Sequence, residues 1–284
     1  MRQDPRLAEW IEANGAFPCT MVDRITPVTA PADRDWLEAT YAFGDSCPVF
    51  CEPFTQWVIE DTFAAGRPAW ESAGAQLVED VTPYELMKLR LLNATHLAIC
   101  APAQLMGFKY VHEAVRDPRI SRLAQRLMAC ETGPTVPPPP GIDLDLYKTD
   151  VVRRFGNSTT ADTTERVNTD ASLNYLLDPL RDCMDAGRPA PVLSFAVAAW
   201  IHRSAGKDDA GHVLSVSNPT AAALNHQASR YGHHADMVLS HREVFGDLSD
   251  RPAFRREVGR WLQKFEFEGT AGALSTLLGG GKFE

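Results

Sequence analysis

The sequence contains none of the glycine-rich loops with which proteins commonly hold nucleotide phosphates. No Gly-x-Gly-x-x-Gly opens a strand–loop–helix unit, and no Gly-x-x-x-x-Gly-Lys-Ser/Thr is present in the 284 residues. The chain therefore offers no predicted cradle for a dinucleotide pyrophosphate or a nucleoside triphosphate. An enzyme that used a nicotinamide coenzyme with this chain would need the phosphate site from another segment or another protein.

Positive charge is also scarce. Lysine and arginine number 28 against 37 aspartates and glutamates, which gives a formal net charge of −9. Nucleic-acid binding depends on a basic face that contacts phosphates, so this balance argues against a DNA or RNA partner.

We find neither a secretory leader nor a membrane-spanning run in the sequence. Residues 1–10 carry charged side chains and no apolar core of the kind that a leader has. The apolar run at residues 191–201 is far shorter than the roughly 20 residues that a membrane span needs. We expect a cytoplasmic protein without a membrane partner.

Cysteine and histidine form no recognisable metal site. Of the six cysteines, only Cys47 and Cys51 are close in sequence, and no second pair of ligands follows them. His233 and His234 are adjacent, which is more typical of a surface pair. We expect free thiols that pack as small apolar groups, and no metal cofactor.

Helical patterns dominate after residue 80, whereas residues 1–80 mix helix and strand signals. Residues 82–85 combine a capping box with a proline at the first helical position, which predicts the start of a helix. This helix should end near residue 100, because Pro102 interrupts its hydrogen bonding. We predict a mainly α fold with two domains, a small α/β part at 1–80 and a multihelical part at 81–284. The predicted strands are 20–26 and 54–60, and the predicted helices are 5–14, 33–41, 82–100, 109–116, 119–130, 146–155, 160–177, 191–203, 221–230 and 252–265.

Three polar residues interrupt the apolar helix predicted over residues 82–100. On an ideal α-helix Asn93 and His96 share a face, and His96 lies about 80° round the axis from Lys88. Desolvation favours the neutral amine of a lysine, which can accept a proton from an alcohol while an amide donor stabilises the alkoxide. These residues would support metal-free alcohol dehydrogenation. The alternative is structural: Lys88 and His96 border the core, with Arg90 on the solvent side.

The spacing Lys-x-x-x-x-Asn-x-x-His at residues 88–96 resembles the catalytic signature of the mannitol dehydrogenase family of long-chain polyol and hexuronate dehydrogenases. Four further stretches resemble the same family in order and spacing, namely residues 17–27, 52–61, 134–143 and 147–157. The resemblance implies a helical domain like the C-terminal domain of 6-phosphogluconate dehydrogenase, preceded by a remnant of a Rossmann domain. It also implies hydride transfer between a polyol or ketose and NAD or NADP, with a lysine base and no metal.

The resemblance implies roles for individual residues. Lys88 matches the general base, Asn93 matches one amide of the oxyanion-stabilising pair, and His96 matches a ligand of a substrate hydroxyl. Asp23 and Arg166 match polar residues that line the cleft for substrate and nicotinamide. Asp23 is therefore a candidate for both substrate and cofactor binding.

Two features differ from the family pattern. Residues 170–174 read Asp-Ala-Ser-Leu-Asn where the family usually has Asp-Gly-Ser-Ser-Lys. Asn174 replaces a cationic substrate contact, and since it can bond hydroxyls but cannot pair with a carboxylate, neutral polyols are favoured over hexuronates. The family's glycine loop and its second catalytic asparagine precede the segment like residues 6–14, and Met1 stands almost at that point. We expect the missing half of the active site to come from a separate Rossmann-domain chain or from sequence upstream.

Two functions are compatible with these features. The first is an NAD(P)-dependent polyol oxidoreductase present as its C-terminal portion, and the second is a catalytically inactive remnant or binding module that keeps the sugar cleft. A regulatory or assembly protein on the same scaffold has no positive signal. We expect the isolated chain neither to bind NADH detectably nor to oxidise a polyol. We also expect unpaired strand edges near residues 21–26 and 54–59, which favour aggregation or require a partner.

Overall fold

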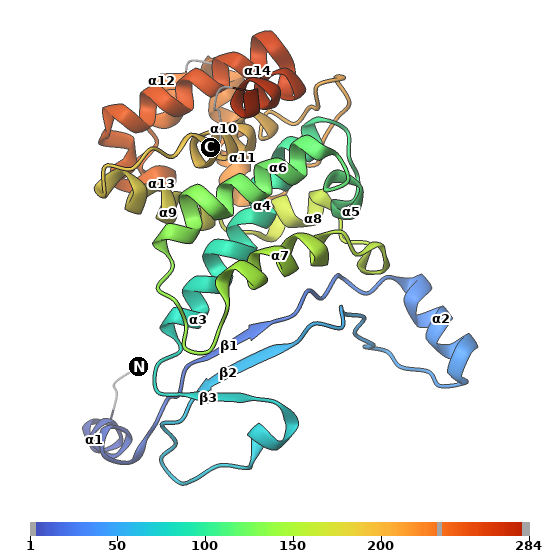
Figure 1. Cartoon of the computed structure of the whole chain (residues 1–284), viewed down its shortest axis with the longest axis vertical. Coiled ribbons are helices and arrows are strands. Elements are labelled where there is room, and N and C mark those ends of the chain that lie inside the picture. The colour runs from blue at the N-terminus through green and yellow to red at the C-terminus, as the bar shows by residue number, and fades with distance from the viewer. Residues whose placement is uncertain (1–3, 232–234, 280–284) are drawn as a thin grey trace. The chain divides into compact units, whose positions relative to one another are not determined.

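The computed structural model describes residues 4–231 and 235–279, and the chain divides into two compact units between Leu86 and Met87. The described residues are mostly helical, with one small sheet of three strands in the first unit (Figure 1). This confirms the predicted mainly α fold with a small α/β part. In the described part of the chain, none of the helices has the length and apolar character needed to cross a membrane.

The sheet of the first unit joins three short strands in the order β1–β2–β3. Strand β1 (Thr20–Asp23) pairs antiparallel with β2 (Gln56–Glu60), and β2 pairs parallel with β3 (Gln76–Val78). The two predicted strands are present but shorter. The first strand ends at Asp23. Beyond it, the N–H of Ile25 donates to a side-chain oxygen, Glu52 Oε1, at 2.7 Å instead of to a neighbouring strand. The three-residue β3 was not predicted, since so short a segment carries no alternating pattern.

Two helices of the first unit, α1 (Pro5–Asn14) and α2 (Pro31–Tyr41), have no buried residue. Trp10 on α1 is 61% exposed and Trp36 on α2 is 50% exposed. The other large exposed apolar side chains of the first 60 residues are Leu7, Ile11, Phe17, Val22, Val28, Tyr41, Phe43, Val49 and Trp57. Exposed apolar surface on this scale is typical of a face that another protein segment covers.

The second unit is a group of helices around two buried ones, α4 (Ala94–Leu105) and α10 (Pro191–Arg203). Every residue of α4 is buried, and α10 packs against both α4 and α14 (Figure 1). The remaining elements are α5 (Val111–Ala114), α6 (Pro118–Arg126), the π-helix η3 (Leu127–Thr132), α7 (Leu144–Phe155), α8 (Thr164–Asp170), α9 (Asn174–Asp185), α11 (Pro219–Tyr231), α12 (Ala235–Leu239), α13 (Arg242–Phe245) and α14 (Pro252–Gly279), with short 3-10 turns at Gly133–Thr135, Ser158–Thr160 and Gly246–Asp250.

The helix predicted over residues 82–100 starts at Thr82 as expected but differs from expectation in its cap, its end and its winding. It begins as α3 (Thr82–Met87), where Asp80 Oδ1 accepts from the N–H of Thr82 at 2.9 Å, so Asp80 takes the place of the predicted cap. It continues through Pro102 to Leu105. A proline inside a helix costs roughly 3 kcal/mol, and complete burial of α4 offsets that cost, because one buried leucine or isoleucine contributes about 1.5–3 kcal/mol. Between α3 and α4 the chain forms the π-helix η2 (Lys88–Asn93).

Two further helix predictions were wrong in their bounds. The helix expected over 160–177 is broken, since Ala171 has extended backbone angles (φ −74°, ψ 137°) between α8 and α9. Helix α14 extends well beyond residue 265, with a kink at Gly269 (φ 66°). At that kink Asp209 accepts hydrogen bonds from the backbone N–H and the hydroxyl of Thr270 at 2.7 and 2.9 Å. The helix predicted at 191–203 is confirmed as α10.

Helix α10 begins on a buried carboxylate. The N–H groups of Val192 and Leu193 donate to the two carboxylate oxygens of Glu131, each at 2.8 Å. These donors belong to the first turn, where a helix has no internal acceptors for them. Glu131 is only 2% exposed, and burial raises the pKa of its carboxyl to about 7 despite the two backbone bonds.

Candidate functional site

The first two predicted catalytic residues lie at the two ends of the π-helix η2, Lys88 at its start and Asn93 at its end. The N–H of Ala94 donates to the carbonyl of Leu89, five residues earlier, which is the bond of a π-turn. On a regular α-helix, residues five apart lie about 140° from each other. The wider π-turn has more residues per turn, so Asn93 lies closer to the side of Lys88 than a regular α-helix would place it. Such turns occur frequently at functional sites.

Arg90 holds the π-helix in place. The structural alternative placed this residue on the solvent side, but it is largely buried. Its side chain is 15% exposed, pairs with Asp182 of α9, and donates to the carbonyl of Thr135 at 2.7 Å. Arg90 thus anchors η2 to two neighbouring segments of the second unit. Lys88 and Asn93, on the same element, are half-buried.

His96 lies one turn further along, in α4, and is buried. Its ring stacks on Phe155 with centroids 4.5 Å apart, and its Nε2 lies 3.7 Å from Asp162 Oδ2. This Nε2 has no hydrogen-bond partner among the described residues. Burial lowers the pKa of His96 to about 4; the charge of Asp162 opposes this shift, and the nearby Arg166 and Arg154 reinforce it. The imidazole is therefore neutral near pH 7, with one ring nitrogen left to bond a ligand hydroxyl.

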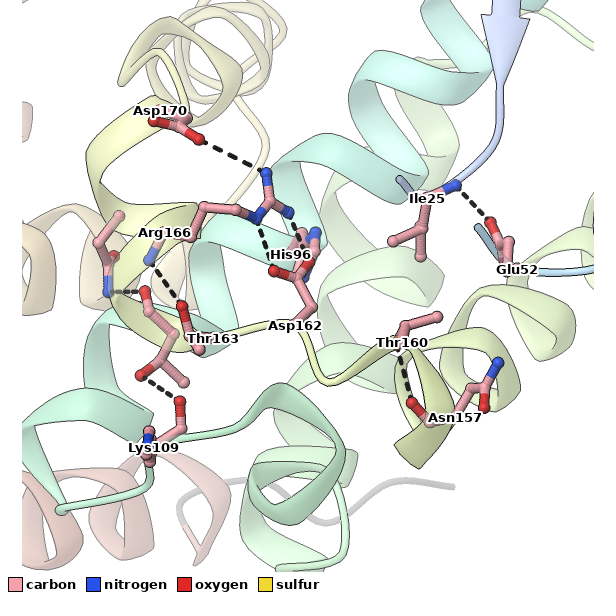
Figure 2. Close-up of polar contacts among 12 residues, drawn as sticks. Ile25, Glu52, His96, Lys109, Asn157, Thr160, Asp162, Thr163, Arg166 and Asp170 are labelled. Atoms are coloured by element: carbon pink, nitrogen blue, oxygen red, sulfur yellow. Dashed lines mark hydrogen bonds and ion pairs between the residues drawn. The ribbon is translucent and has the colours of Figure 1, made fainter. Parts of the chain in front are cut away.

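Arg166, predicted as a substrate contact, lies beside His96 and is fixed by carboxylates (Figure 2). Its Nε and Nη2 donate to the two oxygens of Asp162 at 2.6 and 2.5 Å. Its Nη1 lies 3.6 Å from Asp170 Oδ2, too far for a hydrogen bond. The hydrogen bonds to Asp162 hold the pKa of Arg166 above its usual value, so the guanidinium stays charged.

Asp162 is the residue of this cluster that was not predicted. It is 4% exposed, and it is the only residue of the described chain that contacts both His96 and Arg166 as an ion-pair partner. The one sequence signal was its place four residues before Arg166, a spacing at which oppositely charged side chains meet on a helix. The structure thus brings together His96, Arg166 and Asp162 in the second unit.

The remaining two predicted site residues are Asn174, in the second unit, and Asp23, in the first. Asn174 is exposed at the start of α9, and its N–H donates to Ser172 Oγ at 3.3 Å. Asp23 belongs to the first unit, where it ends β1 opposite Gln56 and is 1% exposed. Their roles rest on the sequence alone.

All six cysteines carry free thiols, but only Cys100 and Cys183 are buried, so the expectation that the thiols pack as small apolar groups is wrong for the other four. Within residues 4–231 and 235–279, no three histidines, cysteines or acidic residues gather in a group that could hold a metal ion. The adjacent His233 and His234 lie outside the described residues.

Comparison with known proteins covers nearly the whole chain. Residues 80–266 match the mannitol dehydrogenase C-terminal domain, and residues 2–72 match the mannitol dehydrogenase Rossmann domain. The mannitol 2-dehydrogenase of Aspergillus oryzae is 39% identical over 274 residues, which cover 94% of this chain and 55% of that protein. The mannitol 2-dehydrogenase of Aspergillus fumigatus is 40% identical over 263 residues, 90% of this chain and 52% of that protein. The chain spans about half the length of the curated relatives it matches.

Two solved structures share the fold. The mannitol 2-dehydrogenase of Pseudomonas fluorescens, in a ternary complex with NAD and D-mannitol, matches with a TM-score of 0.89 and 35% identity over 98% of this chain and 57% of that one. A D-sorbitol dehydrogenase in substrate-free form matches with a TM-score of 0.83 and 30% identity over 95% of this chain and 57% of that one.

Proposed function

Because the chain belongs to the mannitol dehydrogenase family, we propose that it supplies the polyol-binding and proton-transfer half of an NAD-dependent polyol dehydrogenase. The observation that carries the proposal is the buried His96, neutral and with Nε2 unbonded among the described residues, beside an Arg166 fixed by Asp162. Both offer hydrogen bonds to hydroxyl groups. His96 lies on α4, which directly follows the π-helix with Lys88 and Asn93, and Arg166 lies on α8, which packs against α4.

In this proposal each site residue has one task. Lys88 accepts the proton of the reacting hydroxyl, and the Asn93 amide donates to the oxygen that becomes negative. His96 and Arg166 hold neighbouring hydroxyls of the polyol, so the carbon to be oxidised has one orientation. The substrate-binding roles of Asn174 and Asp23, and a cofactor contact at Asp23, follow from their motif positions.

The residues of this chain do not fit the pyrophosphate of a dinucleotide. The segment between β1 and α2, residues 24–30, contains no glycine, and the sequence has no Gly-x-Gly-x-x-Gly to bring backbone N–H groups against phosphate. We therefore assign the coenzyme's phosphate site to the remainder of a Rossmann domain, in a longer form of the protein or in a separate chain. NAD bound there would supply the hydride acceptor.

We assign the substrate to uncharged polyols and ketoses of the mannitol type. The solved neighbour that binds D-mannitol is similar over 98% of this chain. Asn174 stands where the family usually has a lysine, so the cation that would pair with a hexuronate carboxylate is missing at that position.

Two measurements test the proposal. The first is binding of D-mannitol to the 284-residue chain, followed by NMR chemical shifts. The second is NADH formation from D-mannitol after the chain is mixed with a separately produced Rossmann half of a relative. We expect mannitol binding by the chain alone, and NADH formation only in the mixture.

A lysine pair provides the matched control for the proton-transfer step. Lys88→Met should abolish NADH formation in the mixture while leaving mannitol bound. Lys148→Met, which removes a lysine paired with Asp145 on the same unit, should leave the rate unchanged. Mannitol binding with no NADH formation in the wild-type mixture would favour the alternative, a catalytically inactive binding module. Absence of both would overturn the proposal.

The exposed apolar side chains of the first unit extend the proposal to a partner. Leu7, Trp10 and Ile11 of α1 are 55%, 61% and 37% exposed, and α2 has no buried residue. Because residues 2–72 match part of a Rossmann domain, we assign the rest of such a domain as the segment that covers these side chains. The chain alone should bind a hydrophobic dye and elute from size exclusion as soluble self-associated species rather than as a monomer, and the Rossmann half should suppress both effects. A monodisperse, dye-free monomer would contradict this assignment.

A further inference from the structure

The buried carboxylate of Asp162 meets two predicted ligand-binding side chains from one rigid position. Its carbonyl accepts from the N–H of Val111 at 2.9 Å, and the next residue, Thr163, forms a β-bridge with Tyr110. Thr163 also caps α8, because its Oγ1 accepts from the N–H of Arg166 at 3.2 Å. The backbone on both sides of the carboxylate is therefore fixed to neighbouring segments.

The contact with Arg166 determines which donors remain for a ligand. The two oxygens of Asp162 accept hydrogen bonds from Nε and Nη2 of Arg166, at 2.6 and 2.5 Å, so the plane of the guanidinium is fixed. The Nη1 group is left without a hydrogen bond from either neighbouring carboxylate, because Asp170 lies 3.6 Å away. His96 Nε2 lies 3.7 Å from Asp162 Oδ2, the oxygen that also accepts from Arg166 Nη2. Figure 2 shows the Arg166 guanidinium between the carboxylates of Asp162 and Asp170.

The same contact offsets the positive charge of the cluster. Asp162 and Asp170 both face Arg166, and Asp162, Arg166 and Arg154 are the charged groups close enough to His96 to shift its protonation. A guanidinium paired with a buried carboxylate attracts a second anion less than a free guanidinium does, since a ligand carboxylate would approach Asp162 as well. Hydroxyl groups meet no such repulsion.

We infer that Asp162 is a positioning residue that orients Arg166 and His96 toward the polyol and, by neutralising Arg166, makes the site select uncharged polyols over sugar acids. The inference rests on the proposed function, and it adds a cause of selectivity separate from Asn174.

The test compares two ligands that differ by one carboxylate, D-mannitol and D-mannonate, with affinities measured by NMR titration of the full chain. The wild type should prefer mannitol. Asp162→Asn keeps the size of the side chain and removes its charge. It should weaken mannitol binding about tenfold, through the loss of one well-oriented charged hydrogen bond, and lower the mannitol-to-mannonate preference about tenfold.

Two further variants separate charge from folding. Asp170→Asn removes a carboxylate that is 57% exposed, so folding should be unaffected, and it should lower the preference about threefold with little change for mannitol. Glu131→Gln removes another buried carboxylate of the same unit that contacts neither Arg166 nor His96, and it should leave the preference unchanged.

Each outcome decides between the inference and the function on which it rests. An unchanged preference in both folded aspartate variants would overturn the inference, while mannitol binding by the wild type would still support the proposed function. If Asp162→Asn does not fold, the Asp170→Asn preference decides. A wild type that binds no polyol would overturn the proposed function and the inference together.

Discussion

The stability of the second unit should depend on pH through Glu131, and substitution by glutamine should reveal this dependence. Burial raises the pKa of the Glu131 carboxyl from 4.5 to about 7. The folded chain therefore holds this proton more tightly than the unfolded chain. Its contribution to stability is fully present below pH 4.5 and is lost as the pH rises through about 7. At about 1.36 kcal/mol per pKa unit, the loss is about 3 kcal/mol.

His96 acts in the opposite direction over nearly the same range. Burial lowers its pKa from 6.5 to about 4, so the unfolded chain binds this proton more tightly than the folded chain. Its contribution is present above pH 6.5 and is lost as the pH falls through about 4, again about 3 kcal/mol. Between pH 4.5 and 6.5 the two contributions nearly cancel. Through these two groups the wild type should therefore vary little in this range and lose only about 0.7 kcal/mol at each end, between pH 6.5 and 7 and between pH 4.5 and 4.

Glu131→Gln removes one of the two opposing contributions. Glutamine keeps one carbonyl oxygen for the N–H groups of Val192 and Leu193, so the variant should fold. Its free energy of unfolding should rise by about 3 kcal/mol from pH 4 to 6.5, because only the His96 contribution remains. Urea unfolding at pH steps of one unit, followed by circular dichroism, measures this difference. Parallel pH curves for variant and wild type would refute the reasoning.

Three further predictions concern single contacts of the second unit. Gly133→Ala should destabilise it by more than about 2 kcal/mol in urea unfolding, because the added Cβ would lie 2.1 Å from the carbonyl oxygen of Met128; Gly259→Ala, whose Cβ would meet only another methyl at 3.5 Å, should cost nothing. Asp209→Ala removes the cap at the kink of α14 and should cost about 1 kcal/mol in the same assay, and a change within error would show that the cap is dispensable. Phe155→Leu should admit water to His96 and return its pKa toward 6.5, as measured by NMR of the imidazole; an unchanged pKa would mean that Phe155 does not shield the ring.

The apolar pattern predicted the buried helix but not how it is wound. A run of leucines around Lys88 indicates a core helix, and α4 is indeed buried throughout. The prediction placed residues at the regular α-helical angle, whereas the chain forms a π-turn from Lys88 to Asn93. That turn adds one residue per hydrogen-bonded ring, and Arg90 within it contacts a distant segment of the chain through Asp182 of α9. A single-sequence pattern does not contain those contacts.

The cluster around His96 was predicted in part for a similar reason. Arg166 and His96 matched a family pattern, whereas Asp162 was placed in the helix predicted over residues 160–177, which in the structure begins only at Thr164. Its burial results from the bridge between Tyr110 and Thr163, which joins residues far apart in the sequence. A single polar residue near the start of a predicted helix carries no burial signal, so only the three-dimensional contacts distinguish Asp162 from a solvent-exposed aspartate.

Burial in one helical unit sets opposite protonation states for two groups that would otherwise both be mostly charged at mildly acidic pH. Desolvation removes the proton from His96 and retains it on Glu131, because in each case the low-dielectric surroundings disfavour the charged form. At His96 this has a functional consequence, since a neutral imidazole can bond hydroxyls without attracting anions. Arg166 keeps its charge, but Asp162 offsets it. Desolvation of His96 and ion pairing of Arg166 thus favour the same class of ligand, an uncharged polyol. This preference should persist until the pH falls to about 4, where His96 becomes protonated.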